Sequence, residues 1–369
     1  MKYINKFDPQ KDQVVRILDV DGKVIDEKLL PKISDKQLIE AYKLMNLSRR
    51  QDDFQNKAQR QGRLLSFLSS TGQEACEVAY ALAMVKGQDW LAPGYRNNAA
   101  WLTAGMPMHN IMMYWMGNEF GGQSPQGVNL LPPNIIIGSQ YSQAVGIAFA
   151  EKYKKTNGVA LTSTGDGGMS EGEVYESMNF AKLHELPVVF ICENNKWAIS
   201  TPYAKSTKSL NVAVKGIAVG IPGIKVDGND FLASYAVASE AIEFARQGNG
   251  PVLIEFDTYR LGAHSSSDNP DIYRPKPEYE EALTKDPLIR MKKYLIDKKL
   301  WTEKKQTALD EEQDLFIRQE FDYAEAHKDY PLEDVFNYLY ETKTPELEAQ
   351  YQEAAAFFAA NPNAKGGHH

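Results

Sequence analysis

The chain has 369 residues, of which 43% are apolar and 24% are charged, and its formal net charge is −8. This composition is typical of a globular protein with a sizeable core. The acidic balance argues against a nucleic-acid partner or an anionic membrane surface, because both favour clustered lysine and arginine, and no apolar run approaches the roughly 20 residues that span a bilayer.

Residues 1–33 are predicted to form an N-terminal arm. They begin with MKYINKFDPQ, which lacks the apolar segment of a secretory signal, so we expect none. The stretch VVRILDVDGKVI has a strand pattern with a turn signal at Asp21-Gly22. Ser34, followed three residues later by Gln37, has the form of a capping box and predicts the start of a long helix.

Residues 34–285 are predicted to form the main domain, in which strand and helix patterns alternate. Strands are predicted at GVALTS, PVVFICEN and PVLIEFDTY, and helices at SQAVGIAFAEKY, EGEVYESMNFAKLHEL and DFLASYAVASEAIEFARQ. Apolar strands alternating with helices predict an α/β fold, with a parallel sheet covered by helices on both faces. Residues 286–369 are charged and helical in pattern, without a strand signal, and predict a helical C-terminal region.

One predicted junction between strand and helix, TSTGDGGMSEGE, places three glycines around Asp166. In a parallel sheet, ligands bind where strands end and helices begin. Glycine lets the backbone approach a ligand, and a helix N-terminus favours phosphate. A carboxylate fits beside phosphate if a divalent cation lies between them, because Mg²⁺ accepts oxygen ligands from both. Taken alone, the motif is equally explained by a tight turn.

The next strand along the chain, PVVFICEN, leads into Asn194-Asn195, and 26 residues separate Gly167 from this pair. Neighbouring parallel strands end at the same edge of a sheet, so an asparagine amide oxygen there can complete the coordination that Asp166 begins. The two motifs together are more specific than either one alone. Their order and interval resemble the thiamine diphosphate signature, in which GDG is followed by NN.

With TGQEA, PGYRNNA, NNKWAISTP and YRLGAHSSSDNPDIYR, these motifs resemble the alpha subunits of the first component of 2-oxo acid dehydrogenase complexes. The resemblance runs from about residue 34 to 340 and is closest to the bacterial pyruvate-specific members. It implies a thiamine diphosphate-binding fold and an α2β2 heterotetramer with a beta subunit. It also implies decarboxylation of pyruvate and transfer of the acetyl group to the lipoyl domain of a dihydrolipoyl acetyltransferase.

Two other functions remain open at this point. The same scaffold can act on branched-chain 2-oxo acids or acetoin, since the beta subunit contributes to the substrate pocket. A non-enzymatic nucleotide-binding module is a more distant alternative, but it gives no use to Asn195. The family also takes from its beta subunit the glutamate that polarises the cofactor's aminopyrimidine ring, so the active site is expected between two polypeptides.

The resemblance also assigns roles to individual residues. The implied magnesium ligands are the side chains of Asp166 and Asn195 and the carbonyl of Trp197. The implied cofactor-binding residues are Tyr95, Arg96, Ile135, Ile137, Gly167, Gly168, Arg260 and His264. His264 lies in a polar stretch with the composition of a loop, and it is also the implied catalytic residue, acting in the transfer to lipoamide.

The remaining histidines and the cysteines receive no catalytic role. His109, His184 and His327 lie in helical or charged patterns, and no histidine has zinc-ligand spacing. The ending KGGHH has the form of an expression-tag remnant, so His368 and His369 are set aside. Cys76 and Cys192 are far apart without a CxxC motif, which predicts two core thiols and favours a cytoplasmic protein.

Overall fold

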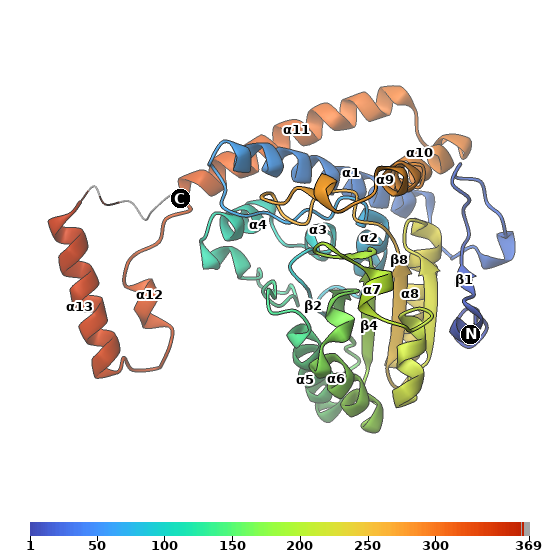
Figure 1. Ribbon diagram of the computed structural model, residues 1–369, viewed down its shortest axis with the longest axis horizontal. Helices are drawn as coiled ribbons and strands as arrows, with labels where there is room; N and C mark the ends of the chain where they lie inside the picture. The colour runs from blue at the N-terminus through green and yellow to red at the C-terminus, as the bar shows by residue number, and fades with distance from the viewer. Residues whose placement is uncertain (363, 365–369) are drawn as a thin grey trace.

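The computed structural model describes residues 1–362 and residue 364, so the tag interpretation of His368 and His369 lies outside the described residues. Its centre is a parallel six-stranded sheet with strand order β1-β7-β8-β4-β3-β2 (Figure 1). The strands are β1 (Val14–Val15), β2 (Trp90–Ala92), β3 (Ala160–Gly165), β4 (Val188–Asn194), β7 (Gly223–Asp227) and β8 (Val252–Asp257). A separate antiparallel pair is formed by β5 (Trp197–Ala198) and β6 (Thr201–Pro202).

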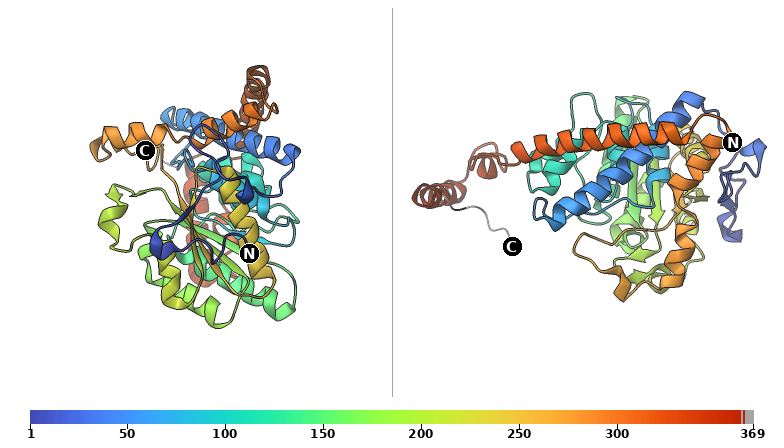
Figure 2. Two further views of the ribbon diagram at one scale, coloured as in Figure 1. Left: turned by 90° about the vertical axis from the view of Figure 1, so that its right-hand side faces the viewer. Right: turned by 90° about the horizontal axis from the view of Figure 1, so that it is seen from above.

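Helices lie around this sheet, and the last helices of the chain project away from the body of the protein (Figures 1 and 2). The helices before the last sheet strand are α1 (Asp35–Arg60), α2 (Glu74–Ala83), α3 (Asn98–Ala104), α4 (Met108–Trp115), α5 (Ser139–Lys154), α6 (Gly172–Leu183), α7 (Tyr203–Ser206) and α8 (Phe231–Arg246). Those after it are α9 (Lys276–Leu283), α10 (Pro287–Asp297), α11 (Glu303–Ala326), α12 (Asp334–Asn337) and α13 (Pro345–Ala360). Short 3₁₀ helices lie at Pro9–Lys11, Glu27–Leu29, Glu119–Gly122, Gly168–Ser170, Ala213–Val219 and Pro270–Ile272.

Strand β4 shows why the sheet needs helices on both faces. Every residue of β4 is buried. Val189 and Ile191 join the core that contains side chains of α2 and α8. Phe190 and Cys192 join the core that contains side chains of α5 and α6. Since successive side chains of a strand point to opposite faces, the continuous apolar run in the sequence reflects burial on two sides, and the predicted α/β fold is confirmed.

The local signals in the sequence correspond to the structure at several element boundaries. Ser34 caps α1 with the predicted capping box, in which its Oγ accepts from Gln37 N at 3.3 Å and its N–H donates to Gln37 Oε1 at 3.0 Å. Strand β7 escaped prediction because the short segment GIKVD carries Lys225 and Asp227. The predicted N-terminal arm supplies β1, which pairs with β7 at the edge of the sheet. The division at residues 33 and 285 remains a proposal.

Within residues 286–362, the C-terminal region consists of helices α10 to α13 and the loops between them, and it contains no strand, as its charged pattern predicted. Helix α11 lies along the body of the protein, whereas α12 and α13 project away from it (Figures 1 and 2). Neither α12 nor α13 has a buried residue. The two helices contact each other through the rings of Phe336 and Tyr351, whose centroids are 5.7 Å apart. None of the helices described between residues 1 and 362 is both long and apolar enough to cross a membrane.

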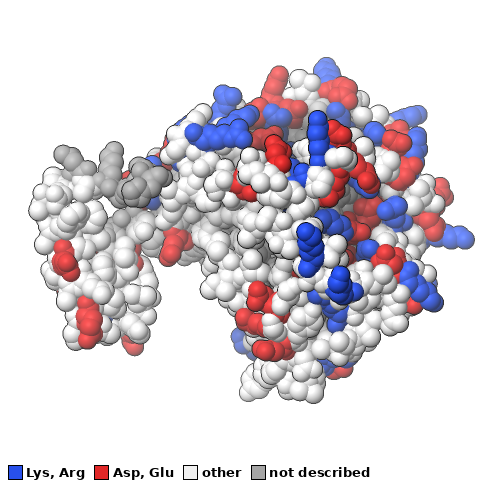
Figure 3. Space-filling view, viewed as in Figure 1, with Lys and Arg blue, Asp and Glu red and all other residues white. Residues whose placement is uncertain are grey.

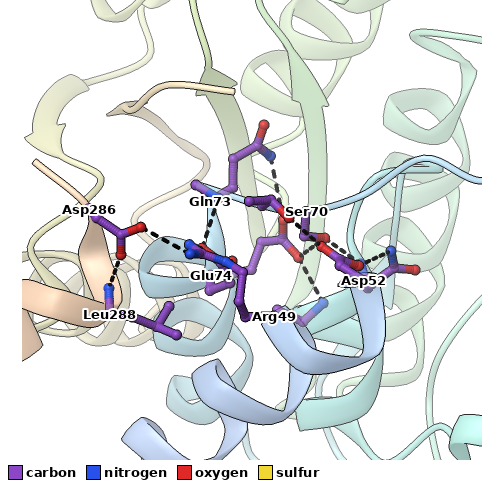
Figure 4. Close-up of polar contacts among 12 residues, drawn as sticks. Arg49, Asp52, Ser70, Gln73, Glu74, Asp286 and Leu288 are labelled. Atoms are coloured by element: carbon purple, nitrogen blue, oxygen red, sulfur yellow. Dashed lines mark hydrogen bonds and ion pairs between the residues drawn. The ribbon is translucent and has the colours of Figure 1, made fainter. Parts of the chain in front are cut away.

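A buried ion pair joins three helices near the start of α2 (Figure 4). Arg49 on α1 donates through Nη2 to Glu74 Oε2 at 3.0 Å and through Nη1 to Asp286 Oδ2 at 2.9 Å. Glu74 begins α2, is completely buried, and also accepts a hydrogen bond from Gly72 N at 2.9 Å. Asp286 in turn caps α10 by accepting from Leu288 N at 2.8 Å. Arg49 therefore pairs with two acids and holds α1, α2 and α10 together.

Replacing Arg49 with methionine should lower the free energy of unfolding by about 3–5 kcal/mol, because it leaves Glu74 buried without its cation. The matched control is Arg50→Met, one residue away on the same helix. Arg50 pairs with Asp310 and Asp314, whose side chains are 32% and 49% exposed, so its loss should cost about 1 kcal/mol or less. Chemical denaturation of both variants provides the measurement, and equal losses would contradict the assignment.

Candidate functional site

A cavity of about 240 Å³ lies at the carboxyl ends of β3 and β4. These strands are neighbours, with Gly165 paired to Glu193, so Asp166 and Asn195 follow two adjacent strand ends. This is the edge at which parallel sheets bind ligands. Apart from Ile135, the residues predicted for the site all line this cavity: Tyr95, Arg96, Ile137, Asp166, Gly167, Gly168, Asn195, Trp197, Arg260 and His264.

Four other residues considered in the sequence analysis do not line the cavity. Ile135 lies outside the lining, and its side chain is 52% exposed. His109, His184 and His327 are not among the lining residues. The structure thus brings the GDG motif and the Asn194-Asn195 pair together with Arg260 and His264. The chemical roles of these residues remain proposals.

Asp166 has a carboxylate without a complete set of partners. The residue is 2% exposed, and its Oδ2 atom has no hydrogen-bond partner among the described residues. Burial raises the pKa of Asp166 to about 6, although the charges of Lys196 and Arg260 lower it in part. A buried, unpaired carboxylate oxygen destabilises a protein unless a cation or donor meets it. Asp166 is therefore suited to holding a cation.

Two further oxygen atoms belong to the same donor set. Asn195 donates through Nδ2 to Gln73 Oε1 at 2.7 Å, while its Oδ1 accepts from Trp197 N at 3.3 Å. The carbonyl oxygen of Trp197 accepts from Arg260 Nη1 at 3.0 Å. Carboxylate, amide and carbonyl oxygens are the ligands that Mg²⁺ prefers. The described part of the chain contains no cluster of three or more His, Cys, Asp or Glu side chains that suits a metal.

Gly167 and Gly168 lie where a side chain would not fit. A Cβ atom on Gly167 would lie 2.8 Å from Ala198 Cβ, and one on Gly168 would lie 2.1 Å from Thr164 Oγ1. Both distances are shorter than van der Waals contact. The glycines therefore allow the backbone between β3 and α6 to pass directly along the cavity, and this is the feature that a bulky anionic ligand requires.

Two buried arginines that line the same cavity contact His264. Arg96 Nη2 lies 3.1 Å from His264 Nδ1 and donates to the His264 carbonyl at 2.7 Å. Arg260 Nη1 lies 3.4 Å from the same Nδ1, and Arg260 Nε has no hydrogen-bond partner among the described residues. Burial, followed by the charges of Arg96 and Arg260, lowers the pKa of His264 to about 4. The imidazole is therefore neutral at pH 7, and the paired guanidinium groups favour an anion.

Sequence reasoning assigned no role to two lining residues, Gln73 and Glu193. Glu193 is buried near the end of β4, and burial raises its pKa to about 7. Its carboxylate accepts hydrogen bonds from Ser163 Oγ at 2.7 Å and from Gln73 Nε2 at 2.6 Å. The available signal was a glutamate within the apolar strand PVVFICEN. Gln73 gave no such signal. The motif TGQEA contributed to the family resemblance, but the resemblance assigned no role to this glutamine.

Comparison with known proteins agrees with this geometry. The family described as "Dehydrogenase E1 component" matches residues 42–333. The chain is 45% identical to the pyruvate dehydrogenase E1 component subunit alpha of Acholeplasma laidlawii, over 91% of this chain and 97% of that protein. It is 42% identical to the protein of the same name from Mycoplasma genitalium, with coverage of 93% and 96%. For the one from Staphylococcus aureus, identity is 41%, with coverage of 93% and 92%.

Replacing Asp166 with asparagine should stabilise the cofactor-free protein at pH 8 by up to about 3 kcal/mol. The folded-state pKa of about 6 lies above the value of about 3.9 for an unfolded aspartate. The ionised carboxylate therefore destabilises the folded state above pH 6, and this penalty declines as the pH falls through 6 and disappears near pH 4. Thermal unfolding between pH 5 and 8 measures the effect.

The matched control is Asp53→Asn, which alters an exposed carboxylate and should leave the pH dependence of stability unchanged. The result that would count against the burial argument is an Asp166→Asn variant that is less stable than the parent across the whole pH range.

Proposed function

Because the chain belongs to the dehydrogenase E1 component family, we propose that it is the alpha subunit of a pyruvate dehydrogenase. It decarboxylates pyruvate with thiamine diphosphate and Mg²⁺, and it transfers the acetyl group to the lipoyl group of a dihydrolipoyl acetyltransferase. The observation that carries this proposal is the unpaired Asp166 carboxylate in a cavity that two glycines and two arginines also line. The named relatives act, by their names, on pyruvate, so branched-chain 2-oxo acids and acetoin have no comparable support.

The residues present fit this cofactor. Asp166, Asn195 and the Trp197 carbonyl would hold Mg²⁺, since they supply oxygen atoms at the ends of two adjacent strands. The backbone of Gly167 and Gly168 would lie along the diphosphate. Arg96 and Arg260 have the charge and the planar donor geometry that phosphate oxygens require, and Tyr95 lies beside them.

The aminopyrimidine end of the cofactor would contact Ile137, which lines the cavity, and Ile135, whose exposed side chain is free to meet it. When bound, the cofactor supplies the carbanion stabilisation that decarboxylation of a 2-oxo acid needs. The chain would contribute oxygen ligands for the cation and positively charged groups that orient the cofactor. These are the functions that its buried polar groups can perform.

His264 is the group of this chain that is best placed to move a proton. Burial, followed by the positive charges of Arg96 and Arg260, lowers the pKa of its imidazole and keeps it neutral. An anion between the arginines would offset these charges and raise the pKa of His264 towards neutral pH. His264 would then be able to share a proton with the lipoyl group during acetyl transfer, while contacts to its loop from Asp268 hold it in place.

A beta subunit completes the proposed active site within an α2β2 heterotetramer. The residues described contain one parallel sheet and hence one half of a two-domain cofactor site. Large apolar side chains are exposed near the cavity and on α5 and α6, including Ile136, Tyr153 and Leu183. On the face shown in Figure 3, the arm formed by α12 and α13 carries few charges, and the side chains of Leu339 and Phe357 are exposed there. Exposed apolar side chains of this kind are typical of a protein that binds a partner.

A cytoplasmic location belongs to the same proposal. Both cysteines are buried and free, as is usual for proteins of a reducing compartment. The other proposed contacts of the complex are with pyruvate and with the lipoyl domain and core of the acetyltransferase.

The proposal predicts that the purified chain alone has no decarboxylase activity, because it provides only one side of the cofactor site. Together with its beta subunit, Mg²⁺ and thiamine diphosphate, it should show its highest kcat/KM for pyruvate. Steady-state assays with pyruvate, branched-chain 2-oxo acids and acetoin measure this preference. Activity of the isolated chain, or a higher kcat/KM with another substrate, would show that the proposal is wrong.

Replacing His264 with alanine should slow reductive acetylation of lipoamide by about 10²–10⁴-fold, the usual contribution of a proton-transfer group. Decarboxylation measured with an artificial electron acceptor, which bypasses lipoamide, should fall much less. Ser265→Ala, on the same loop, is the matched control and should change neither rate. If His264→Ala lowers both rates equally, the histidine serves cofactor binding or decarboxylation instead.

A further inference from the structure

We propose that Gln73 is a positioning residue that determines which atom of the Asn195 side-chain amide faces the cation site. A cation needs the amide oxygen, because the amide nitrogen has donor hydrogens and offers no ligand electron pair. The inference rests on the proposed magnesium–thiamine diphosphate site and adds to it the residue that orients one of its ligands.

Gln73 lies between the cavity and a buried acidic cluster. It is the N-cap residue of α2, is 1% exposed, and lines the cavity (Figure 4). Its Nε2 donates to Glu193 Oε2 at 2.6 Å and, at 3.4 Å, to Glu77 Oε1. Its Oε1 accepts from Asn195 Nδ2 at 2.7 Å. The glutamine thus connects two buried acids to the proposed metal ligand.

The chemistry of these groups fixes the direction of each one. Both oxygens of Glu193 accept hydrogen bonds from neutral side-chain donors, Ser163, Tyr80 and Asn97 on Oε1 and Asn97 on Oε2. Since an amide NH₂ only donates hydrogen bonds, Nε2 of Gln73 must face Glu193. Its Oε1 then faces Asn195 and requires Nδ2 as donor. With Nδ2 engaged, Oδ1 is the remaining polar atom of the Asn195 amide, and the opposite orientation would place two oxygens against each other. The longer hydrogen bond from Trp197 N to Oδ1, at 3.3 Å, favours the same orientation, and the shorter contact with Gln73, at 2.7 Å, is the stronger of the two.

The Glu193 carboxylate is held in position by several further hydrogen bonds. Besides Gln73, its carboxylate accepts from Ser163 Oγ at 2.7 Å, Asn97 Nδ2 at 2.9 Å and Tyr80 OH at 3.1 Å. These donors come from β3, α2 and the residue before α3, so they hold the carboxylate from several elements. The orientation of Asn195 is therefore determined from the core outwards.

The test compares two substitutions in the complex with the beta subunit, with Mn²⁺ in place of Mg²⁺ and thiamine diphosphate present. Gln73→Met removes the acceptor for Asn195 Nδ2, so the Kd for Mn²⁺, measured by electron paramagnetic resonance, should rise about 10–100-fold. Gln73→Glu keeps an acceptor for Asn195 Nδ2 but places an oxygen against Glu193, so its Kd should rise less than that of Gln73→Met. A role in packing alone predicts the reverse order, because methionine fills the space and glutamate adds a third acid.

Tyr80→Phe is the matched control, since it removes a different donor from Glu193 and leaves Gln73 paired with Asn195. Its Kd for Mn²⁺ should rise far less than that of Gln73→Met. A parent-like Kd for Gln73→Met, weaker binding by Gln73→Glu than by Gln73→Met, or equal losses in Gln73→Met and Tyr80→Phe would each overturn the inference. If Gln73→Glu fails to assemble, the comparison of Gln73→Met with Tyr80→Phe decides. Absence of Mn²⁺ binding by the parent complex would instead overturn the proposed function.

Discussion

The buried, unpaired carboxylate of Asp166 is the constraint on which the account of this protein depends. A chain under selection for stability alone would replace it, because burial makes its charged form unfavourable. Its surroundings explain why it is tolerated. Asn195 and the Trp197 carbonyl supply further oxygens, and Arg96 and Arg260 supply positive charge to the same cavity. We therefore propose that the site holds a cation and an anion together.

The fold brings these charges together through the edge of one sheet. Strands β3 and β4 are buried on both faces, so their register is set by two cores, and their ends hold Asp166 and Asn195 in place. Behind this edge, Arg49 pairs with Glu74 and Asp286, while Glu193 accepts hydrogen bonds from neutral donors. Glu74 and Asp286 thus take part in helix packing, whereas Glu193 lines the cavity.

Much of this could be predicted from sequence because the signals were local or periodic. The apolar strands, the capping box at Ser34 and the interval between GDG and NN each have a direct physical meaning, and the convergence of Arg96, Arg260 and His264 followed from the family resemblance. The contacts of Gln73 could not be predicted, because they join it to residues 120 and 122 positions away. Strand β7 was missed because its five residues include Lys225 and Asp227, which interrupt the apolar pattern. Ile135 lies outside the cavity lining of this chain, so its proposed contact depends on the assembled complex.

The most direct test of the central claim is a crystal structure of the complex with the beta subunit, thiamine diphosphate and Mn²⁺, with the ion located by its anomalous scattering. The account predicts one strong anomalous peak per alpha subunit, within coordination distance of Asp166 Oδ2, Asn195 Oδ1 and the Trp197 carbonyl oxygen, with the diphosphate completing the shell. A peak elsewhere in the chain, or cofactor bound at this cavity with no ion at Asp166, would contradict it.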